Sequence, residues 1–271
     1  MADFTLHYGL DWAMISFYSF TLVLVRISGL MIVGPVFGQP VVPINVRILL
    51  AVALSLLITP AVTVNASHFP SQLPATLLDY MWVAFGELAL GFAIGLGVMS
   101  ILSGLQMAGQ LIDQQIGLAL GEVFSPSLDI VGSVSGQLLF RFGVIIILLM
   151  EPFGGHVLML SALLETFQTF PVGEATISAS TVDLLSGIVH QSLVLAVQLA
   201  APLLATMSLV ALAMGFLGHT VPQINILVVG FSIRALVSLL ILALSLSGVA
   251  MEIVDVVPRV IDEIRIALSS L

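Results

Sequence analysis

Long apolar runs separated by short polar breaks dominate this chain of 271 residues. A helix needs about 20 apolar residues to cross the hydrocarbon of a bilayer. The main apolar runs lie at residues 14–34, 47–59, 80–105, 184–233 and 234–248. This pattern predicts an all-α protein that is integral to a membrane and is built from hydrophobic helices.

Two shorter apolar runs, residues 137–150 and 157–170, hold roughly fourteen residues each, fewer than a span requires. They are therefore predicted to form the two arms of a helical hairpin. The run at residues 184–233 has no Asp, Glu, Lys or Arg over roughly fifty residues, which is enough for two spanning helices. Pro222 and the polar residues around it predict a break at residues 218–225.

Glycines and prolines mark the shape of the first three runs. Pro35, Pro40 and Pro43 predict an ordered elbow after the first run, and the second run is predicted to stop at Pro60. In the third run, the motif Gly91-x-x-x-Gly95 together with Gly97 forms a small-residue face. Another helix is expected to approach that face closely.

The last part of the chain, residues 251–271, is predicted to form a separate amphipathic helix with Pro258 near its start. Asp262 and Arg265 are spaced for an ion pair on one face. The apolar side chains on the other face are Val260, Ile261, Ile264 and Leu268. Such a helix binds an interface or a partner, or it forms a solvated helix end.

The segment from Gln106 to Pro126 breaks the apolar pattern with amides, acids and glycines. Asp113 and Glu122 would be costly if they faced hydrocarbon. Irregular backbone at membrane depth must face protein or a water-filled path. The segment is therefore predicted to be a loop that closes a pore.

Composition agrees with a membrane protein and excludes several functions. The chain is 59% hydrophobic and 8% charged, with mean hydropathy +1.22. Its formal net charge is −9, and it has no lysine, which argues against nucleic-acid binding. There are no cysteines, and the first residues lack the basic region of a cleaved signal peptide.

No catalytic constellation is visible. The five histidines lack zinc-ligand spacing, and no nucleotide-binding or nucleophile motif occurs. Asp113, Glu122 and Glu151 could form a proton relay, although a structural or gate-lining role also explains them. Arg26 lies inside the first run, where it needs a partner or a route to the surface. An enzyme is not expected, nor is a cofactor or metal.

Several motifs occur in order along nearly the whole chain. The first set is Arg26, Pro35, Pro43, Arg47 and Pro60; the second is Ala108-Gly109-Gln110, Gly117 and Pro126. The later sets are residues 153–156 with 171–173, Ala201-Pro202, residues 221–226, Gly230-Phe231 and Arg234. Together they resemble the FliR family of flagellar export-gate proteins, whose injectisome counterpart is SctT. His219 departs from the family's usual arginine, and Arg234 replaces its usual lysine.

The resemblance implies hydrophobic helical hairpins with broken helices, integral to a membrane-associated export-gate complex. One copy would assemble with FliP-like and FliQ-like subunits, beside FlhB-like and FlhA-like proteins, in the bacterial inner membrane at the flagellar basal body. The complex would pass unfolded protein substrates. The chain would be one domain, with a helical part at 1–172, a hairpin at 173–250 and the helix at 251–271.

By the same resemblance, a central loop at about residues 106–126 would plug the channel. The expected plug residues are Gly109, Gln110, Asp113, Ile116, Gly117, Leu118, Leu120, Gly121, Val123 and Phe124. The structural-motif residues are Arg26, Pro35, Pro43, Arg47, Pro222, Gln223, Asn225 and Arg234. The apolar plug residues would seal the pore by packing or dewetting.

Two other functions remain open at this point. Broken helices and intramembrane acids also fit a proton-coupled or small-solute secondary transporter. Such a transporter should show matching breaks in its two halves, and the break at residues 218–225 has no counterpart in the first half. A purely structural membrane scaffold is the third possibility.

Overall fold

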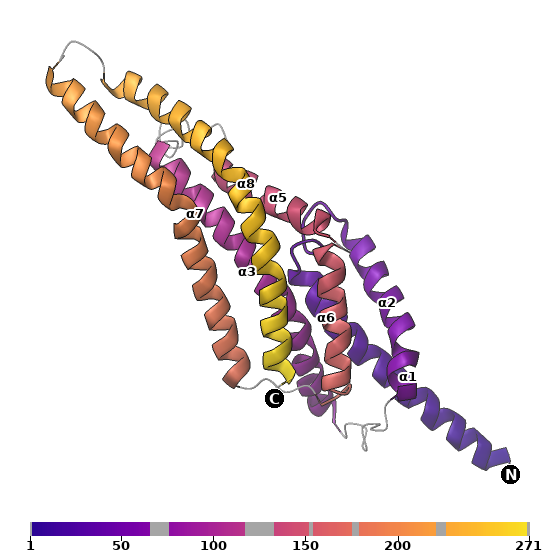
Figure 1. The fold of residues 1–271 in the computed structure, drawn as a ribbon. Coiled ribbons are helices and arrows are strands. Elements are labelled where there is room, and N and C mark those ends of the chain that lie inside the picture. Colours follow the sequence, from indigo (N-terminus) through magenta and orange to yellow (C-terminus); the bar gives the residue numbers. More distant parts are fainter. Residues whose placement is uncertain are drawn as a thin grey trace. The chain divides into compact units, whose positions relative to one another are not determined.

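A computed structural model describes residues 2–65, 76–116, 133–151, 154–174, 179–220 and 226–269 (Figure 1). Within these ranges the regular structure is entirely helical, which confirms the predicted all-α class. The helices are α1 (Ala2–Val33), α2 (Ile44–Asn65), α3 (Leu77–Ile116), α5 (Val134–Leu149), α6 (Gly155–Thr169), α7 (Ala179–Thr220) and α8 (Ile226–Ser269).

Five of the helices are long and apolar enough to cross a membrane: α1, α2, α3, α7 and α8. The helices α5 and α6 have 16 and 15 residues, so they are too short to span, as their sequences predicted. The predicted break after Gly218 is also present, because α7 ends at Thr220 and α8 begins at Ile226.

Prolines interrupt fewer helices than expected. The prediction that the second run stops at Pro60 is wrong, because α2 continues through it to Asn65. A separate helix at residues 251–271 is likewise wrong, because α8 runs unbroken through Pro258. A long apolar helix can absorb a proline when neighbouring groups satisfy the backbone carbonyl that it frees.

The predicted loop at residues 106–126 is wrong for its first half. Residues 106–116 form the last turns of α3, and the rest of the segment lies outside the described residues. The amides Gln110, Gln114 and Gln115 lie on the exposed side of this helix, while Ala108, Ile112 and Ile116 are buried, and the one buried acid, Asp113, has hydrogen-bond partners of its own. The segment is thus amphipathic rather than irregular.

The described chain forms two compact units, each assembled from distant segments. Unit 1 comprises residues 1–99, 151–187 and 258–271, and unit 2 comprises residues 100–150 and 188–257. These divisions do not coincide with those expected at residues 172 and 250. The predicted pairing of α5 with α6 stays a prediction, because these two helices belong to different units.

Close contact between α1 and α3 organises the core of unit 1. A Cβ atom added at Gly29 would lie 2.4 Å from the Leu88 carbonyl oxygen, and one at Gly91 would lie 1.9 Å from that of Arg26. Only glycine permits backbones this close. The predicted small-residue face of the third run is therefore confirmed. The end of α8 covers this unit with buried Val260, Ile261 and Ile264, so its apolar face packs within the chain rather than on a partner.

Unit 2 contains most of the α7–α8 hairpin, residues 188–257, and Figure 1 shows the two helices running side by side away from their connection. Near that connection, a Cβ atom at Gly230 would lie 3.3 Å from the Met214 Cε atom. Few residues of the hairpin are buried: 28% in an 18-residue apolar stretch of α7 and 22% in one of α8. Much of its apolar surface is therefore available to lipid or to other proteins.

We predict that Gly91→Ala destabilises the protein by about 1–3 kcal/mol, because the new methyl group would collide with the α1 backbone. The matched control is Gly248→Ala in α8, where nothing lies within 4 Å of the added atom. Alanine should stabilise that exposed helical position by up to about 1 kcal/mol. Denaturant unfolding in detergent measures both changes, and equal effects would contradict the close crossing.

Candidate functional site

The end of α3 and the beginning of α5 meet at a polar contact, which we term the α3–α5 junction (Gly109, Asp113, Ser133, Ser135 and Gly136). Asp113 Oδ2 accepts hydrogen bonds from the Ser133 hydroxyl at 2.6 Å and from the Ser135 backbone N–H at 3.0 Å. The Ser133 hydroxyl in turn accepts from the Gly136 N–H at 2.8 Å, which caps α5. A carboxylate here satisfies free N–H groups and complements the positive end of the helix dipole.

Glycines bring the two helices together at the α3–α5 junction. A Cβ atom at Gly109 would lie 2.3 Å from the Gly136 backbone nitrogen. Asp113 itself is only 6% exposed, and its second oxygen, Oδ1, is buried without a hydrogen-bond partner among the described residues. A buried carboxylate oxygen without a hydrogen bond is costly, so the packing of the two helices must keep Asp113 in this position.

The structure places four of the expected plug residues. Gly109 and Asp113 lie in the α3–α5 junction, Gln110 is exposed, and Ile116 is buried at the end of α3. The other six lie outside the described residues: Gly117, Leu118, Leu120, Gly121, Val123 and Phe124.

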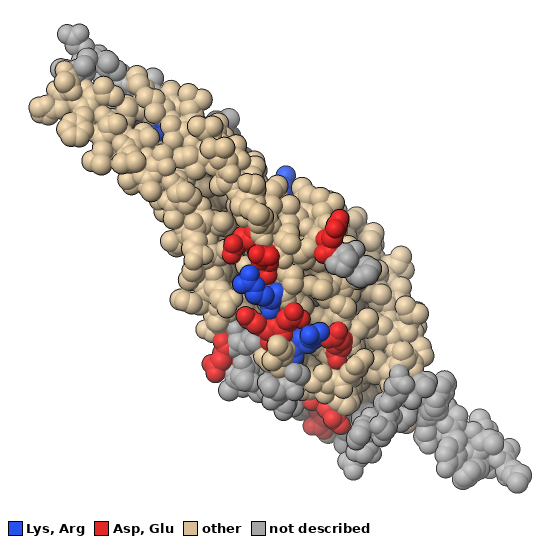
Figure 2. All heavy atoms as spheres, viewed as in Figure 1, with Lys and Arg blue, Asp and Glu red and all other residues tan. Residues whose placement is uncertain are grey.

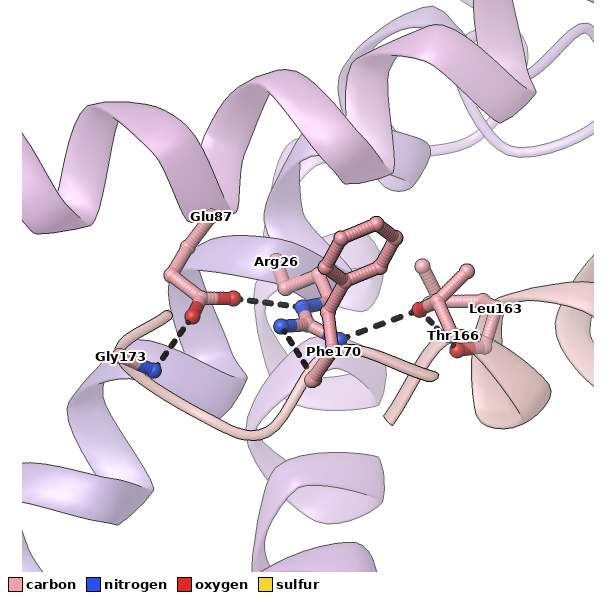
Figure 3. A network of polar contacts seen from close by, with 6 residues as sticks. All are labelled: Arg26, Glu87, Leu163, Thr166, Phe170 and Gly173. Carbon is pink, nitrogen blue, oxygen red and sulfur yellow. Dashed lines mark hydrogen bonds and ion pairs between the residues drawn. The ribbon is translucent and has the colours of Figure 1, made fainter. Parts of the chain in front are cut away.

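A second polar cluster lies in the core of unit 1, where Arg26 of α1 meets Glu87 of α3 (Figure 3). Arg26 Nε donates to Glu87 Oε2 at 2.5 Å, and both side chains are 0% exposed. The other guanidinium nitrogens donate to the Thr166 hydroxyl and the Phe170 carbonyl, each at 3.2 Å. Each guanidinium nitrogen of Arg26 therefore has an acceptor, which offsets the cost of burying the charge.

The same cluster fixes the end of α6. The Arg26 guanidinium carbon lies 4.2 Å from the centre of the Phe167 ring, a cation–π contact. Glu87 Oε1 accepts from the Gly173 N–H at 2.8 Å, and the φ of 94° at Gly173 strongly favours glycine. One ion pair therefore joins α1, α3, α6 and the turn that follows α6.

The remaining structural-motif residues differ in their surroundings. Arg47 donates to the backbone carbonyls of Gln39 and Val42, so it holds the elbow between α1 and α2. In that elbow Pro35 is buried and Pro43 is exposed. Arg234 is half-buried in α8 and has no partner among the described residues. Pro222, Gln223 and Asn225 lie outside those residues.

The sequence did not reveal the partners of the buried residues Arg26 and Asp113. Arg26 and Glu87 are the sole charged residues in their apolar runs, 14–34 and 80–105, and opposite charges alone in apolar runs are a usable indication of pairing. Ser133, three residues before Gly136, carried a recognisable N-cap pattern. The roles of the Phe170 carbonyl and the Gly173 N–H carried no sequence indication, because backbone groups are common to all residues.

Charged side chains are unevenly distributed. On the face drawn in Figure 2 they gather around the C-terminal half of α8, and most of the remaining described surface is uncharged. There Arg265 pairs with Glu165 at 3.0 Å and with Asp262 at 3.4 Å, as the spacing of the latter pair predicted. No group of three or more His, Asp or Glu side chains within the described part of the chain could hold a metal ion.

Comparison with known proteins decides the family. Residues 17–259 match the family described as bacterial export proteins, family 1. The chain belongs to this family. The resemblance to FliR and SctT seen in the ordered motifs is thereby confirmed, and the chain is a membrane-embedded bacterial export protein.

Individual relatives agree over most of their length. The flagellar biosynthetic protein FliR of Pectobacterium carotovorum is 30% identical over 238 residues, which cover 87% of each chain. FliR of Bacillus subtilis is 28% identical over 254 residues, covering 92% of this chain and 94% of the relative. The Yop proteins translocation protein T of Yersinia pestis is 27% identical over 229 residues, covering 83% and 85%.

We predict that Arg26→Met in this export protein lowers the free energy of unfolding by about 3–5 kcal/mol, because it leaves Glu87 buried and uncompensated. Adding Glu87→Leu should recover most of that loss. The control is Arg265→Met, which removes two ion pairs whose members are each about half exposed and should cost below about 1 kcal/mol. A double variant less stable than Arg26→Met alone would contradict the pairing.

We also predict that Asp113→Ala weakens the first turn of α5. Hydrogen exchange at the Ser135 and Gly136 amides should accelerate about 5- to 150-fold, as expected for about 1–3 kcal/mol. Asp113→Asn should have a smaller effect, because it keeps an acceptor oxygen and loses only the charge. The control Gln114→Ala changes an exposed neighbour and should leave this exchange unaltered.

Proposed function

We propose that this chain is the FliR-type gate subunit of a flagellar type III export apparatus, and that it is not an enzyme. In this role it assembles with FliP-like and FliQ-like subunits, beside FlhB-like and FlhA-like proteins, in the bacterial inner membrane. Together they form a channel for unfolded flagellar proteins. The names of the relatives, flagellar FliR and the Yop translocation protein T, support this system.

Exposed apolar surface supports assembly with other subunits. Large apolar side chains are exposed on α8 from Val229 to Val254, and charged side chains follow toward its end (Figure 2). At 1.5 Å per residue, this apolar stretch is about 38 Å long, against a hydrocarbon thickness of about 30 Å. Lipid alone covers it only if the helix tilts by about 37°, near the upper end of the usual range of about 0–40°. Contact with neighbouring subunits is the other way to cover this surface.

The α3–α5 junction is the observation that carries the plug assignment. It joins the last described turns before residues 117–132 to the first turn after them, so both ends of that segment start from one fixed point. Anchored ends allow a loop of small and apolar residues to obstruct a channel without changing the surrounding helices. In this proposal Asp113 is an anchor of the plug.

The contacts of the intramembrane acids make the transporter alternative weaker. Glu87 is paired with Arg26, and Asp113 is committed to capping α5. Glu151 is exposed, and Glu122 lies outside the described residues. These contacts explain both described buried acids as structural groups without a proton relay.

The test uses a flagellated bacterium that lacks its own FliR-family protein and expresses this chain instead. The full chain should restore secretion of flagellar proteins, and it should copurify with FliP-like and FliQ-like subunits. Deleting residues 117–124 should keep the complex intact but raise its ion conductance, because the apolar seal is lost. Gln114→Ala serves as the control for an unrelated change nearby.

Two results would contradict the proposal in different ways. A chain that purifies as a lone, stable monomer and restores no secretion would refute the gate-subunit role. A complex with residues 117–124 deleted that conducts no more ions than the full complex would refute the plug while leaving the gate role intact.

A further inference from the structure

A groove on unit 2 gathers the polar side chains of α7. Its volume is about 210 Å³, and it is bounded by α3, α7 and α8. Its lining consists of Ile101 from α3, six residues of α7, and Glu252 with Val256 from α8. The α7 residues are His190, Gln191, Ser192, Val194, Leu195 and Gln198.

The polar residues of this groove are unusual for the helices that carry them. Between Leu185 and Gly218, the sequence of α7 contains one histidine and two amides, and all three line the groove: His190, Gln191 and Gln198. On α8, Glu252 is the first charged residue after Arg234. Polar side chains within the apolar span of α7 are costly where they face lipid, so their collection in one place indicates a binding function.

The wall of the groove is fixed by close backbone packing. A Cβ atom added at Gly104 of α3 would lie 2.4 Å from the Ser192 carbonyl oxygen of α7. The Ser192 hydroxyl already donates to the Val189 carbonyl at 2.7 Å, and Leu195 is buried. The groove therefore offers His190, the two amides and Glu252 as its free polar groups, on a preformed surface.

Glu252 is an exposed carboxylate at the edge of the groove. It has no hydrogen bond or ion pair among the described residues, although it lies beside apolar side chains. The whole chain carries 15 acidic residues against 6 basic ones and has no lysine. A neighbouring helix that covers this carboxylate would remove it from water, so the covering surface must supply a cation.

The geometry points to this groove as the docking site for one basic side chain, Arg or Lys, carried by a helix of a neighbouring subunit. The Glu252 carboxylate and the carbonyl oxygens of Gln191 and Gln198 supply acceptors for the several N–H donors of such a group. The volume is below the roughly 300–1,000 Å³ of drug-sized ligand sites, which suits a single side chain. This inference rests on the proposed function, because it requires an assembly of subunits.

The experiment compares Glu252→Gln with Glu263→Gln, an exposed acid on the same helix outside the groove. Each variant is purified by a tag on this chain from cells that make the whole export complex. Glu252→Gln should reduce the recovered neighbouring subunit about tenfold or more, because it removes one member of a charge pair at the interface. Glu263→Gln should leave recovery unchanged.

A photo-activated cross-linking residue at position 198 identifies the occupant independently. The cross-linked peptide should come from another subunit and carry Arg or Lys within one helical turn of the linkage. Exchanging the charges, with Glu252→Arg here and an acid at that basic position, should restore recovery that either single change lowers.

The possible failures are distinguishable. Cross-links confined to lipid or to this chain, or unchanged recovery of Glu252→Gln, would overturn the docking site while the complex still forms. If the unaltered chain copurifies with no subunit at all, the proposed function itself fails.

Discussion

The buried pair of Arg26 and Glu87 sets the arrangement of unit 1. Isolated, either charge would be prohibitively costly in an apolar core, so the two helices that carry them must meet at this point. Gly29 and Gly91 permit the meeting by letting the backbones of α1 and α3 touch. The other nitrogens of Arg26 donate to the end of α6, and the second oxygen of Glu87 accepts from the turn that follows it. One buried ion pair therefore positions three helices.

Unit 2 also contains a buried charge that must be compensated, but the compensating group is different. Asp113 is also a buried acid on α3, but it is compensated by a helix N-terminus rather than by a guanidinium. A helix N-terminus carries less positive charge than an arginine, and one oxygen of Asp113 has no partner within the described part of the chain. The strong pair lies in a core, and the weaker contact lies beside residues 117–132, the segment that we propose as the plug.

Length and apolar surface connect this architecture to assembly. Helices of 40, 42 and 44 residues are about twice as long as a bilayer's hydrocarbon requires. Their exposed surface is largely apolar, and polar side chains on it are grouped. The assembly proposed above would cover part of this surface.

Sequence alone determined the membrane class, the all-helical fold, the short α5 and α6, the break between α7 and α8, and the glycine face of α3. These follow from local composition and periodicity, which act within a single segment. Tertiary structure decided the partners of Arg26 and Asp113, the helical state of residues 106–116, and the continuity of α2 and α8 through Pro60 and Pro258. The charge contacts join residues distant in sequence, because a buried charge is stabilised by whatever group the fold brings near it. Whether a helix continues depends on its whole length and packing rather than on one proline or one polar residue.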